Sequence, residues 1–268
     1  MDYPEDFINR IILGDCLDMM KYIPDNSIDL TVTSPPYDNL RTYKNNLDKF
    51  RFEPIAQELF RITKIGGVVV WIVGDAIIKG SKTGTSFKQA LYFKEIGFNL
   101  HDTMIWNKGG FSAVGALKKR YCPVFDYMFI LSKGNIKIFN PIKDRKTKHG
   151  GKTVSGTIRN ADGSIKPVNK KMIINELSQR FNIWEQSPQK QKGKCHPAPF
   201  PEQLAYDHII SWSNPKDIIL DPMCGSGTTC AMALKANRKY IGIEVVKEYY
   251  RIALKRIMQW RTDNICLL

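Results

Sequence analysis

The stretch that decides the fold is Ile218-Ile219-Leu220-Asp221-Pro222-Met223-Cys224-Gly225-Ser226-Gly227-Thr228-Thr229. Its three leading apolar residues predict a short buried strand, and the glycine-rich loop behind them leads into a predicted helix over 230–236. Residues 239–244 predict a second strand, which ends in an acid. Strand, glycine turn, helix and strand form a nucleotide-binding βαβ unit. The sequence therefore predicts an α/β protein with a parallel sheet.

The loop residues indicate which ligand this unit binds. Gly225 and Gly227 allow the backbone to approach a ligand closely. Glu244 lies 19 residues beyond Gly225, the usual distance for an acid that binds ribose hydroxyls. A nicotinamide enzyme would fit as well, but the Gly-x-Gly-x-x-Gly pattern is incomplete. Asp221 is badly placed beside a pyrophosphate and well placed to accept hydrogen bonds from a ligand ammonium, such as that of S-adenosylmethionine.

A second motif, Ser34-Pro35-Pro36-Tyr37, follows a predicted strand over 27–32. In open α/β sheets, ligands bind at the edge where strands end. The two prolines stiffen the chain and supply carbonyls without N–H groups, and Tyr37 adds a ring. Acceptors beside a π-face suit a planar amine, whose two protons need partners.

Together these motifs resemble the β-group of amino-methylating DNA methyltransferases of restriction–modification systems. The early catalytic motif and the late cofactor loop match that family's circularly permuted order. Further matches occur at 11–17, 104–108, 127–133 and 196–202. The resemblance implies a circularly permuted Rossmann-like fold that uses S-adenosylmethionine. It also implies a catalytic part at 1–139, an inserted basic target-recognition segment at 140–194 and a cofactor-binding part at 195–268.

The resemblance also implies roles for individual residues. Asp15 would read the cofactor adenine, and Phe200 belongs to the segment that closes over the methionine end. Met223 replaces the phenylalanine that is more usual in the family's loop. The expected catalytic residues are Ser34, Pro35, Pro36 and Tyr37, and the expected cofactor residues are Asp15, Phe200, Asp221, Met223, Gly225, Ser226, Gly227, Thr228 and Glu244.

Charge points to a polyanionic partner. The chain of 268 residues carries a net charge of +14, and residues 143–194 hold 13 Lys and Arg against four acids. We expect this segment to bind double-stranded DNA through Lys146, Lys148, Lys170 and Lys171, although a solvated loop is the simpler explanation of a basic stretch. A short helix is predicted over 172–181.

Composition also bears on location and cofactors. No apolar run reaches membrane-spanning length, and the acidic start does not resemble a signal peptide, so we expect a cytoplasmic protein without a membrane partner. The six cysteines show no Cys-x-x-Cys spacing, so neither a metal site nor a disulfide framework is expected. A cognate restriction endonuclease is an expected partner by resemblance.

The chemistry implied is methylation of an exocyclic amine on a flipped base. Ser34 Oγ and the Pro35 carbonyl would accept hydrogen bonds from the amine while Tyr37 stacks on the ring. Within the resembled family, serine at the first motif position is associated with cytosine N4, and aspartate or asparagine with adenine N6. Adenine N6, an RNA or protein amine, and a DNA-binding protein without activity remain the alternatives.

Overall fold

The structure is a computed structural model that describes residues 1–36, 50–110, 119–154, 156–167, 172–188 and 201–265. These residues form two compact units, Met1–Asn140 with Asn182–Leu268, and Pro141–Phe181. Tyr37, Lys170, Lys171 and Phe200 lie outside the described residues, as does most of the predicted segment 196–202.

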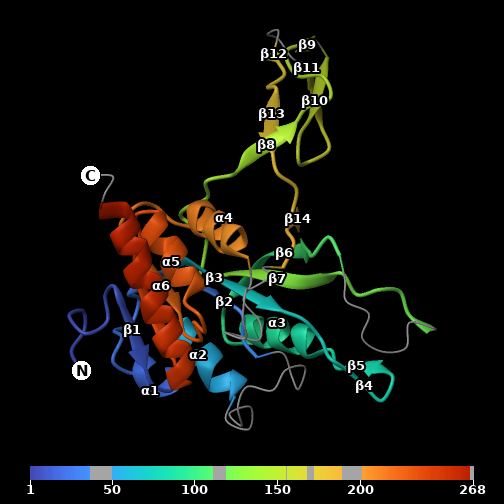
Figure 1. The fold of residues 1–268 in the computed structure, drawn as a ribbon. Helices are drawn as coiled ribbons and strands as arrows, with labels where there is room; N and C mark the ends of the chain where they lie inside the picture. Colours follow the sequence, from blue (N-terminus) through green and yellow to red (C-terminus); the bar gives the residue numbers. More distant parts are fainter. Residues whose placement is uncertain (37–49, 111–118, 155, 168–171, 189–200, 266–268) are drawn as a thin grey trace. The chain divides into compact units, whose positions relative to one another are not determined.

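The larger unit is built on an eight-stranded sheet of order β1-β16-β15-β2-β3-β7-β6-β14 (Figure 1). The strands are β1 (Arg10–Leu13), β2 (Ile28–Thr33), β3 (Thr63–Val73), β6 (Asn99–Asn107), β7 (Phe125–Ser132), β14 (Ile183–Glu185), β15 (Ile218–Asp221) and β16 (Lys239–Glu244). The first five in sheet order are mutually parallel. Their carboxyl ends therefore share one edge.

One strand breaks the expected parallel pattern. β7 pairs antiparallel with both β3 and β6, so the sheet is mixed rather than wholly parallel as the sequence predicted. Hydrophobic periodicity marks a buried strand but carries no information about its direction, because either direction buries the same side chains.

Helices cover both faces of this sheet. They are α1 (Cys16–Met20), α2 (Phe52–Ile62), α3 (Thr85–Glu95), α4 (Glu202–Trp212), α5 (Thr228–Lys235) and α6 (Lys247–Ile265). α5 joins β15 to β16 while α2 joins β2 to β3, and these crossovers step across the sheet in opposite directions. Because both crossovers are expected to be right-handed, α5 and α2 lie on opposite faces of the sheet. α4, α5 and α6 accordingly pack together, and α1, α2 and α3 form the other layer (Figure 1).

The core explains why these segments fold here. α2 buries Ile55, Leu59 and Ile62 along one stripe, and β3 is buried along nearly its whole length, as a central strand should be. Trp71 is fully buried, and its indole N–H donates to Gln89 Oε1 at 2.8 Å. This bond satisfies the polar atom that its burial would otherwise leave unpaired.

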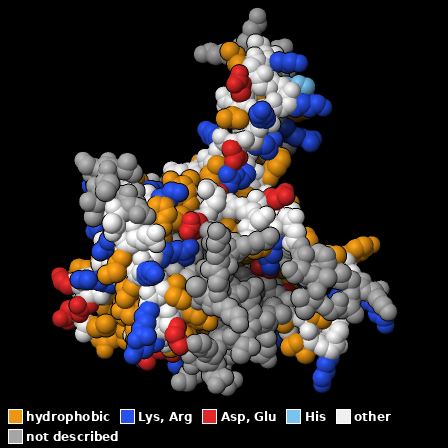
Figure 2. Space-filling view, in the orientation of Figure 1, with side chains coloured by type: hydrophobic (Ala, Val, Ile, Leu, Met, Phe, Trp, Pro, Cys, Tyr) orange, Lys and Arg blue, Asp and Glu red, His pale blue; other side chains and the backbone are white. Residues whose placement is uncertain are grey.

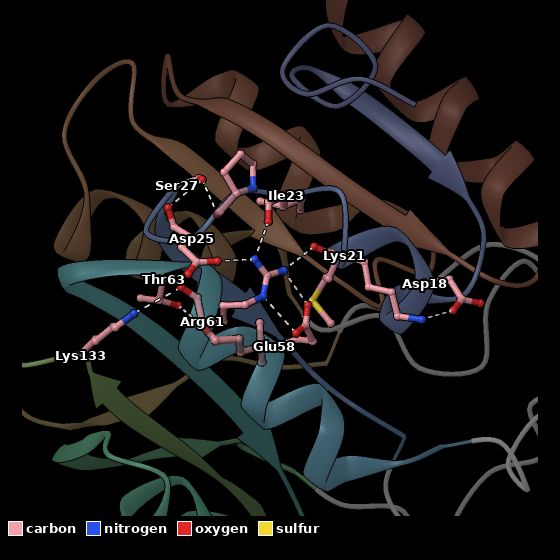
Figure 3. A network of polar contacts seen from close by, with 12 residues as sticks. Asp18, Lys21, Ile23, Asp25, Ser27, Glu58, Arg61, Thr63 and Lys133 are labelled. Atoms are coloured by element: carbon pink, nitrogen blue, oxygen red, sulfur yellow. Dashed lines mark hydrogen bonds and ion pairs between the residues drawn. The ribbon is translucent and has the colours of Figure 1, made fainter.

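A polar network fixes the turn that leads into β2 (Figure 3). The Arg61 guanidinium, at the end of α2, donates to the Ile23 and Met20 carbonyls, each at 2.9 Å. It also forms ion pairs with Asp25 and Glu58, both at 2.7 Å. Hydrogen bonds from Arg61 to Glu58 are the main cause that raises the pKa of this arginine. The network therefore ties α2 to the chain just before the strand that carries the Ser34 motif.

Segments near the two ends of the described chain contact each other. α6 packs on β1, and the Arg261 guanidinium donates to the Asn9 carbonyl at 3.3 Å. The circular permutation itself stays a prediction.

The smaller unit consists of short antiparallel pairs. β8 (Lys143–Lys146) pairs with β13 (Leu177–Gln179), β9 (Thr153–Val154) with β12 (Met172–Ile173), and β10 (Thr157–Arg159) with β11 (Ile165–Pro167). The helix predicted over 172–181 is therefore wrong: both of its halves pair with strands earlier in the chain, and such long-range pairing overrides local propensity. The smaller unit, Pro141–Phe181, covers fewer residues than the predicted segment 140–194. The chain after it returns to the larger unit, where β14 pairs with β6 of the main sheet.

Candidate active site

Three carboxylates stand at the ends of three neighbouring parallel strands. Asp15 follows β1, Glu244 ends β16 and Asp221 ends β15. Leu13 is in register with Glu244 across the β1–β16 pair, and Asp221 is in register with Gly242 across the β15–β16 pair. Ser34 follows β2, the next strand along. The sequence-predicted residues thus meet at one edge of the sheet.

The glycine loop between β15 and α5 has the backbone that its sequence requires. Gly225 and Gly227 have φ of 52° and 77°, a region that glycine enters without strain. A Cβ on Gly227 would lie 3.0 Å from the Ala253 Cβ of α6. Glycine at 227 therefore serves close packing as well as the turn. α5 begins directly after it, at Thr228.

Glu244 braces this loop with its own carboxylate. Its Oε2 accepts from the Gly225 N–H and its Oε1 from the Val246 N–H, both at 2.8 Å. The side chain is 6% exposed. Burial raises the pKa of Glu244, and the two backbone donors act against that rise. A carboxylate has about four lone-pair sites, so Glu244 can hold the loop and still accept from ribose hydroxyls.

Asp221 is the most deeply buried of the three acids. Its Oδ1 accepts from the Thr33 hydroxyl at 2.8 Å and from the Met223 N–H at 3.2 Å. Burial raises the pKa of Asp221 to about 6, and the hydrogen bond from the Thr33 hydroxyl is the largest effect that opposes this rise. When it is ionised, a buried carboxylate attracts a cation more strongly than an exposed carboxylate does, because water screens the two charges less.

The Ser34 motif is attached to the glycine loop at two points. Thr33, whose hydroxyl reaches Asp221, directly precedes Ser34. The Thr229 hydroxyl of α5 donates to the Val32 carbonyl of β2 at 3.1 Å. Ser34 and Pro36 are half-buried, and Pro35 is buried. The start of the Ser34 motif is therefore positioned by the same residues that position the loop.

Arg256 of α6 was missed by the sequence analysis. Its guanidinium donates to the Ser226 carbonyl and hydroxyl, both at 3.1 Å, and to the Thr228 hydroxyl at 2.9 Å. It also pairs with Glu202, the first residue of α4, at 2.8 Å. The Ser226 and Thr228 side chains therefore face α6. No local motif signals such a residue, since one basic position on an amphipathic helix looks like any other.

Asp15 and Met223 are two further residues that were predicted to contact the cofactor. Asp15 is the N-cap of α1, where its carboxylate accepts from the Leu17 N–H at 2.8 Å. Met223 is partly buried and packs against the main hydrophobic core. Both lie on the loops of the sheet edge that carries Asp221.

The acceptors at this edge of the sheet fit the hydrogen-bond donors of S-adenosylmethionine. The cofactor carries an ammonium, two ribose hydroxyls and an adenine amino group, which are all hydrogen-bond donors. The edge offers three carboxylate acceptors in a row beside a glycine loop that permits close approach.

Comparison with known proteins gives the family. The chain matches the DNA methylase family model (N6_N4_Mtase) over residues 28–255. The chain belongs to the DNA methylase family. It is 53% identical over 250 residues to the orphan methyltransferase M.BamHII of Bacillus amyloliquefaciens, covering 90% of this chain and 93% of that protein. It is 28% identical to the DNA adenine methyltransferase YhdJ of Escherichia coli, covering 92% and 82%.

Solved structures share the fold of this DNA methylase. The cytosine-N4-specific PvuII DNA methyltransferase superposes with a TM-score of 0.67 at 21% identity, covering 92% of this chain and 85% of that one. The complex of M1.HpyAVI with S-adenosylmethionine gives 0.60 at 23% identity, covering 92% and 98%. The protein is thus a methyltransferase that acts on DNA, with S-adenosylmethionine as its methyl donor.

The smaller unit of the methylase carries part of the predicted DNA-binding set. Lys146 on β8 and Lys148 just beyond it are both exposed, and Figure 2 shows basic side chains distributed over this unit. Arg145 lies over the Phe181 ring at 4.1 Å from its centroid, and Arg180 pairs with Asp144. These contacts order the base of the β8–β13 pair, while the two lysines stay available to solvent.

Proposed function

We propose that the methylase transfers a methyl group to the exocyclic N4 amine of a flipped cytosine in double-stranded DNA. Serine at position 34 favours cytosine, and the bond between Thr33 Oγ1 and Asp221 Oδ1, at 2.8 Å, supports joint positioning of the base and the methyl donor. This bond joins the residue before Ser34 to the carboxylate that we assign to the cofactor ammonium. Base and methyl donor would therefore be positioned by one rigid connection.

Ser34 and Pro35 are proposed to hold the target amine. The lone pair of an exocyclic amine is delocalised into the ring, so the amine is a weak nucleophile. Hydrogen bonds from its two protons to Ser34 Oγ and the Pro35 carbonyl localise that lone pair. Pro36 keeps the segment extended, and Tyr37, outside the described residues, is proposed to stack on the base.

The chemical step requires little further help from the protein. When bound, S-adenosylmethionine supplies a methyl group that is already activated by its sulfonium. The protein contributes alignment, worth at most about 7–11 kcal/mol in ideal cases. Ser34 is too weak a base to remove a proton first, so the proton leaves after transfer, when the nitrogen is cationic.

Cofactor contacts are proposed at the three strand-end acids and the glycine loop. Asp221 would accept from the ammonium, Glu244 from the ribose hydroxyls and Asp15 from the adenine amine. Gly225 would let the backbone approach, and Met223 and Phe200 would pack against the cofactor. The Ser226 and Thr228 hydroxyls accept from Arg256, so we expect them to act through the loop backbone.

Adenine N6 is the second candidate product. The family model covers both kinds of methylation, and YhdJ is named an adenine methyltransferase. Serine at position 34 favours cytosine. RNA or protein amines rank lower because the catalytic motif precedes the cofactor loop. A companion restriction endonuclease stays a prediction, and the relative from Bacillus amyloliquefaciens is itself named an orphan methyltransferase.

Two experiments test the proposed site. Methylome sequencing of cells expressing the protein identifies base and recognition site together. Ser34→Ala should lose most turnover while calorimetry shows cofactor affinity near that of the wild type. Cofactor affinity that falls in step with turnover would place Ser34 in the cofactor pocket instead.

The basic unit is proposed to bind DNA phosphates. Replacing Lys146, Lys148, Lys170 and Lys171 with glutamine should weaken duplex binding. Each lost phosphate contact should reduce the slope of log affinity against log salt by about 0.9. Lys216→Gln with Lys239→Gln is the matched control, because both lysines are exposed at the opposite, amino-terminal edge of the main sheet. An unchanged slope in the test variant would mean that these lysines face solvent.

A further inference from the structure

A short β-hairpin leaves the active-site edge of the sheet immediately after β3. β4 (Ile77–Ile78) pairs antiparallel with β5 (Ser81–Lys82). The two turn residues, Lys79 and Gly80, both have positive φ, at 48° and 80°. This is the two-residue turn that matches the twist of a hairpin. Figure 1 shows the hairpin as a projection beyond the end of β3.

The hairpin is held firmly at its base. The Thr83 N–H donates to the Ala76 carbonyl at 3.0 Å. Asp75 accepts from the Ser86 N–H at 2.8 Å and from the Ser86 hydroxyl at 2.9 Å. Lys82 lies over the Phe125 ring, 5.7 Å from its centroid. An isolated two-stranded hairpin is only marginally stable in water, so these anchors give it a defined direction.

Its location relates it to the Ser34 motif. Thr33, which precedes Ser34, is in register with Trp71 of β3. β3 ends two residues later at Val73, and the hairpin begins four residues beyond that. Both segments therefore leave the sheet from adjacent parallel strands at the same edge. DNA that presents a flipped base to Ser34 would therefore lie over the same edge of the sheet from which the hairpin projects.

The surface of the hairpin is both apolar and basic. Ile77 and Ile78 are 45% and 49% exposed. Neighbouring strand residues point to opposite faces, so each face of the hairpin shows one isoleucine. Residues 76–94 contain no acid and four lysines. Figure 2 shows hydrophobic and basic side chains together at the lower right, where the hairpin lies.

We propose that hairpin β4–β5 is a second DNA-contact element, which enters a groove of the duplex beside the flipped base. This inference rests on the proposed function. The major groove of B-DNA, about 12 Å wide, admits a two-stranded ribbon. Lys79 and Lys82 contact phosphates on its walls, and Ile77 and Ile78 contact the apolar parts of base edges. Charge complementarity selects DNA, since the hairpin adds positive charge and no negative charge.

The test separates the two kinds of contact. One variant carries Ile77→Ser with Ile78→Ser, and the other carries Lys79→Gln with Lys82→Gln. Ile65→Ser is the apolar control, because Ile65 is 62% exposed at the amino-terminal end of β3. Lys216→Gln with Lys239→Gln is the charge control. Cofactor affinity, measured by calorimetry, should stay at the wild-type value in all four proteins.

Binding is measured by fluorescence anisotropy with a labelled mixed-sequence duplex over a series of salt concentrations. The lysine variant should lower the log–log slope by about 1.8, because two phosphate contacts are lost. The isoleucine variant should bind about tenfold more weakly with the slope unchanged, because apolar contact does not release counterions. Both controls should bind like the wild type.

Three outcomes would overturn the inference. Hairpin variants that bind the duplex like their controls would exclude contact with DNA while leaving the proposed function intact. Hairpin variants that change the sedimentation coefficient of the free protein would identify a second copy of the chain as the occupant. A wild-type protein that binds no duplex would overturn the proposed function and the hairpin role together.

Discussion

Thr33→Val is the substitution that probes the connection between the two halves of the site. Valine keeps the shape of threonine but removes the hydroxyl that donates to Asp221 Oδ1 at 2.8 Å. A hydrogen bond to a charged group contributes about 1.5–3 kcal/mol. One pKa unit corresponds to 1.36 kcal/mol. The pKa of Asp221, already raised to about 6 by burial, should therefore rise by roughly one to two further units.

The sign of the pH effect follows from which form binds the cofactor. The proposed contact pairs the ammonium of S-adenosylmethionine with the ionised carboxylate, so affinity should increase as pH rises through the pKa of Asp221. In the wild type this increase should be centred near pH 6, because the pKa of Asp221 is about 6. In Thr33→Val it should be centred at about pH 7–8, which makes binding at neutral pH about two- to tenfold weaker.

Thr31→Val is a matched control on the same strand. Thr31 is fully buried like Thr33, but its hydroxyl has no hydrogen-bond partner in the part of the chain that the structure describes. Its replacement should leave the pH midpoint unchanged and the free energy of unfolding equal or higher. Titration calorimetry with cofactor between about pH 5 and 8 measures both variants. An unshifted midpoint in Thr33→Val, or an equal shift in Thr31→Val, would mean that the Thr33 hydroxyl does not control the ionisation of Asp221.

Other substitutions test the remaining parts of the cofactor site. Gly225→Val should abolish cofactor binding, because its φ of 52° strains a branched residue and its side chain fills the ligand space. Gly134→Val, with a φ of 73° at the opposite edge of the sheet, should bind cofactor normally if it folds, as judged by circular dichroism. Arg256→Gln should weaken cofactor binding by about tenfold, because it loses charge-assisted bonds to the loop worth about 1.5–3 kcal/mol. Arg251→Gln, exposed on the same helix, should have no effect, and equal affinities for these two arginine variants would exclude a positioning role for Arg256.

The buried segments were predictable because their local pattern agrees with their environment. β2, β15 and β16 are short runs rich in apolar residues and bounded by turn residues, and each lies where the sequence placed it. The glycine loop was predictable for the same reason, since its positive φ values require the residues that its sequence shows. The gathering of Asp15, Asp221 and Glu244 at one edge then follows from parallel pairing alone.

The contacts that join distant segments were not predictable. Thr33 and Asp221 are 188 residues apart, and no periodicity links them. Arg256 reaches Ser226 from a helix whose polar residues look alike in sequence. The short pairs of the smaller unit, such as Met172 with Val154, depend on partners that a local window does not contain. Each of these features is set by tertiary contact rather than by local propensity.

The identity of the methylated base tests the proposed function most directly. The protein is incubated with labelled S-adenosylmethionine and genomic DNA, the DNA is digested to nucleosides, and the labelled species is identified by mass spectrometry. We expect N4-methylcytosine. N6-methyladenine as the sole product would contradict the base assignment and leave the cofactor site standing, whereas label found only in RNA or protein would contradict the proposed function itself.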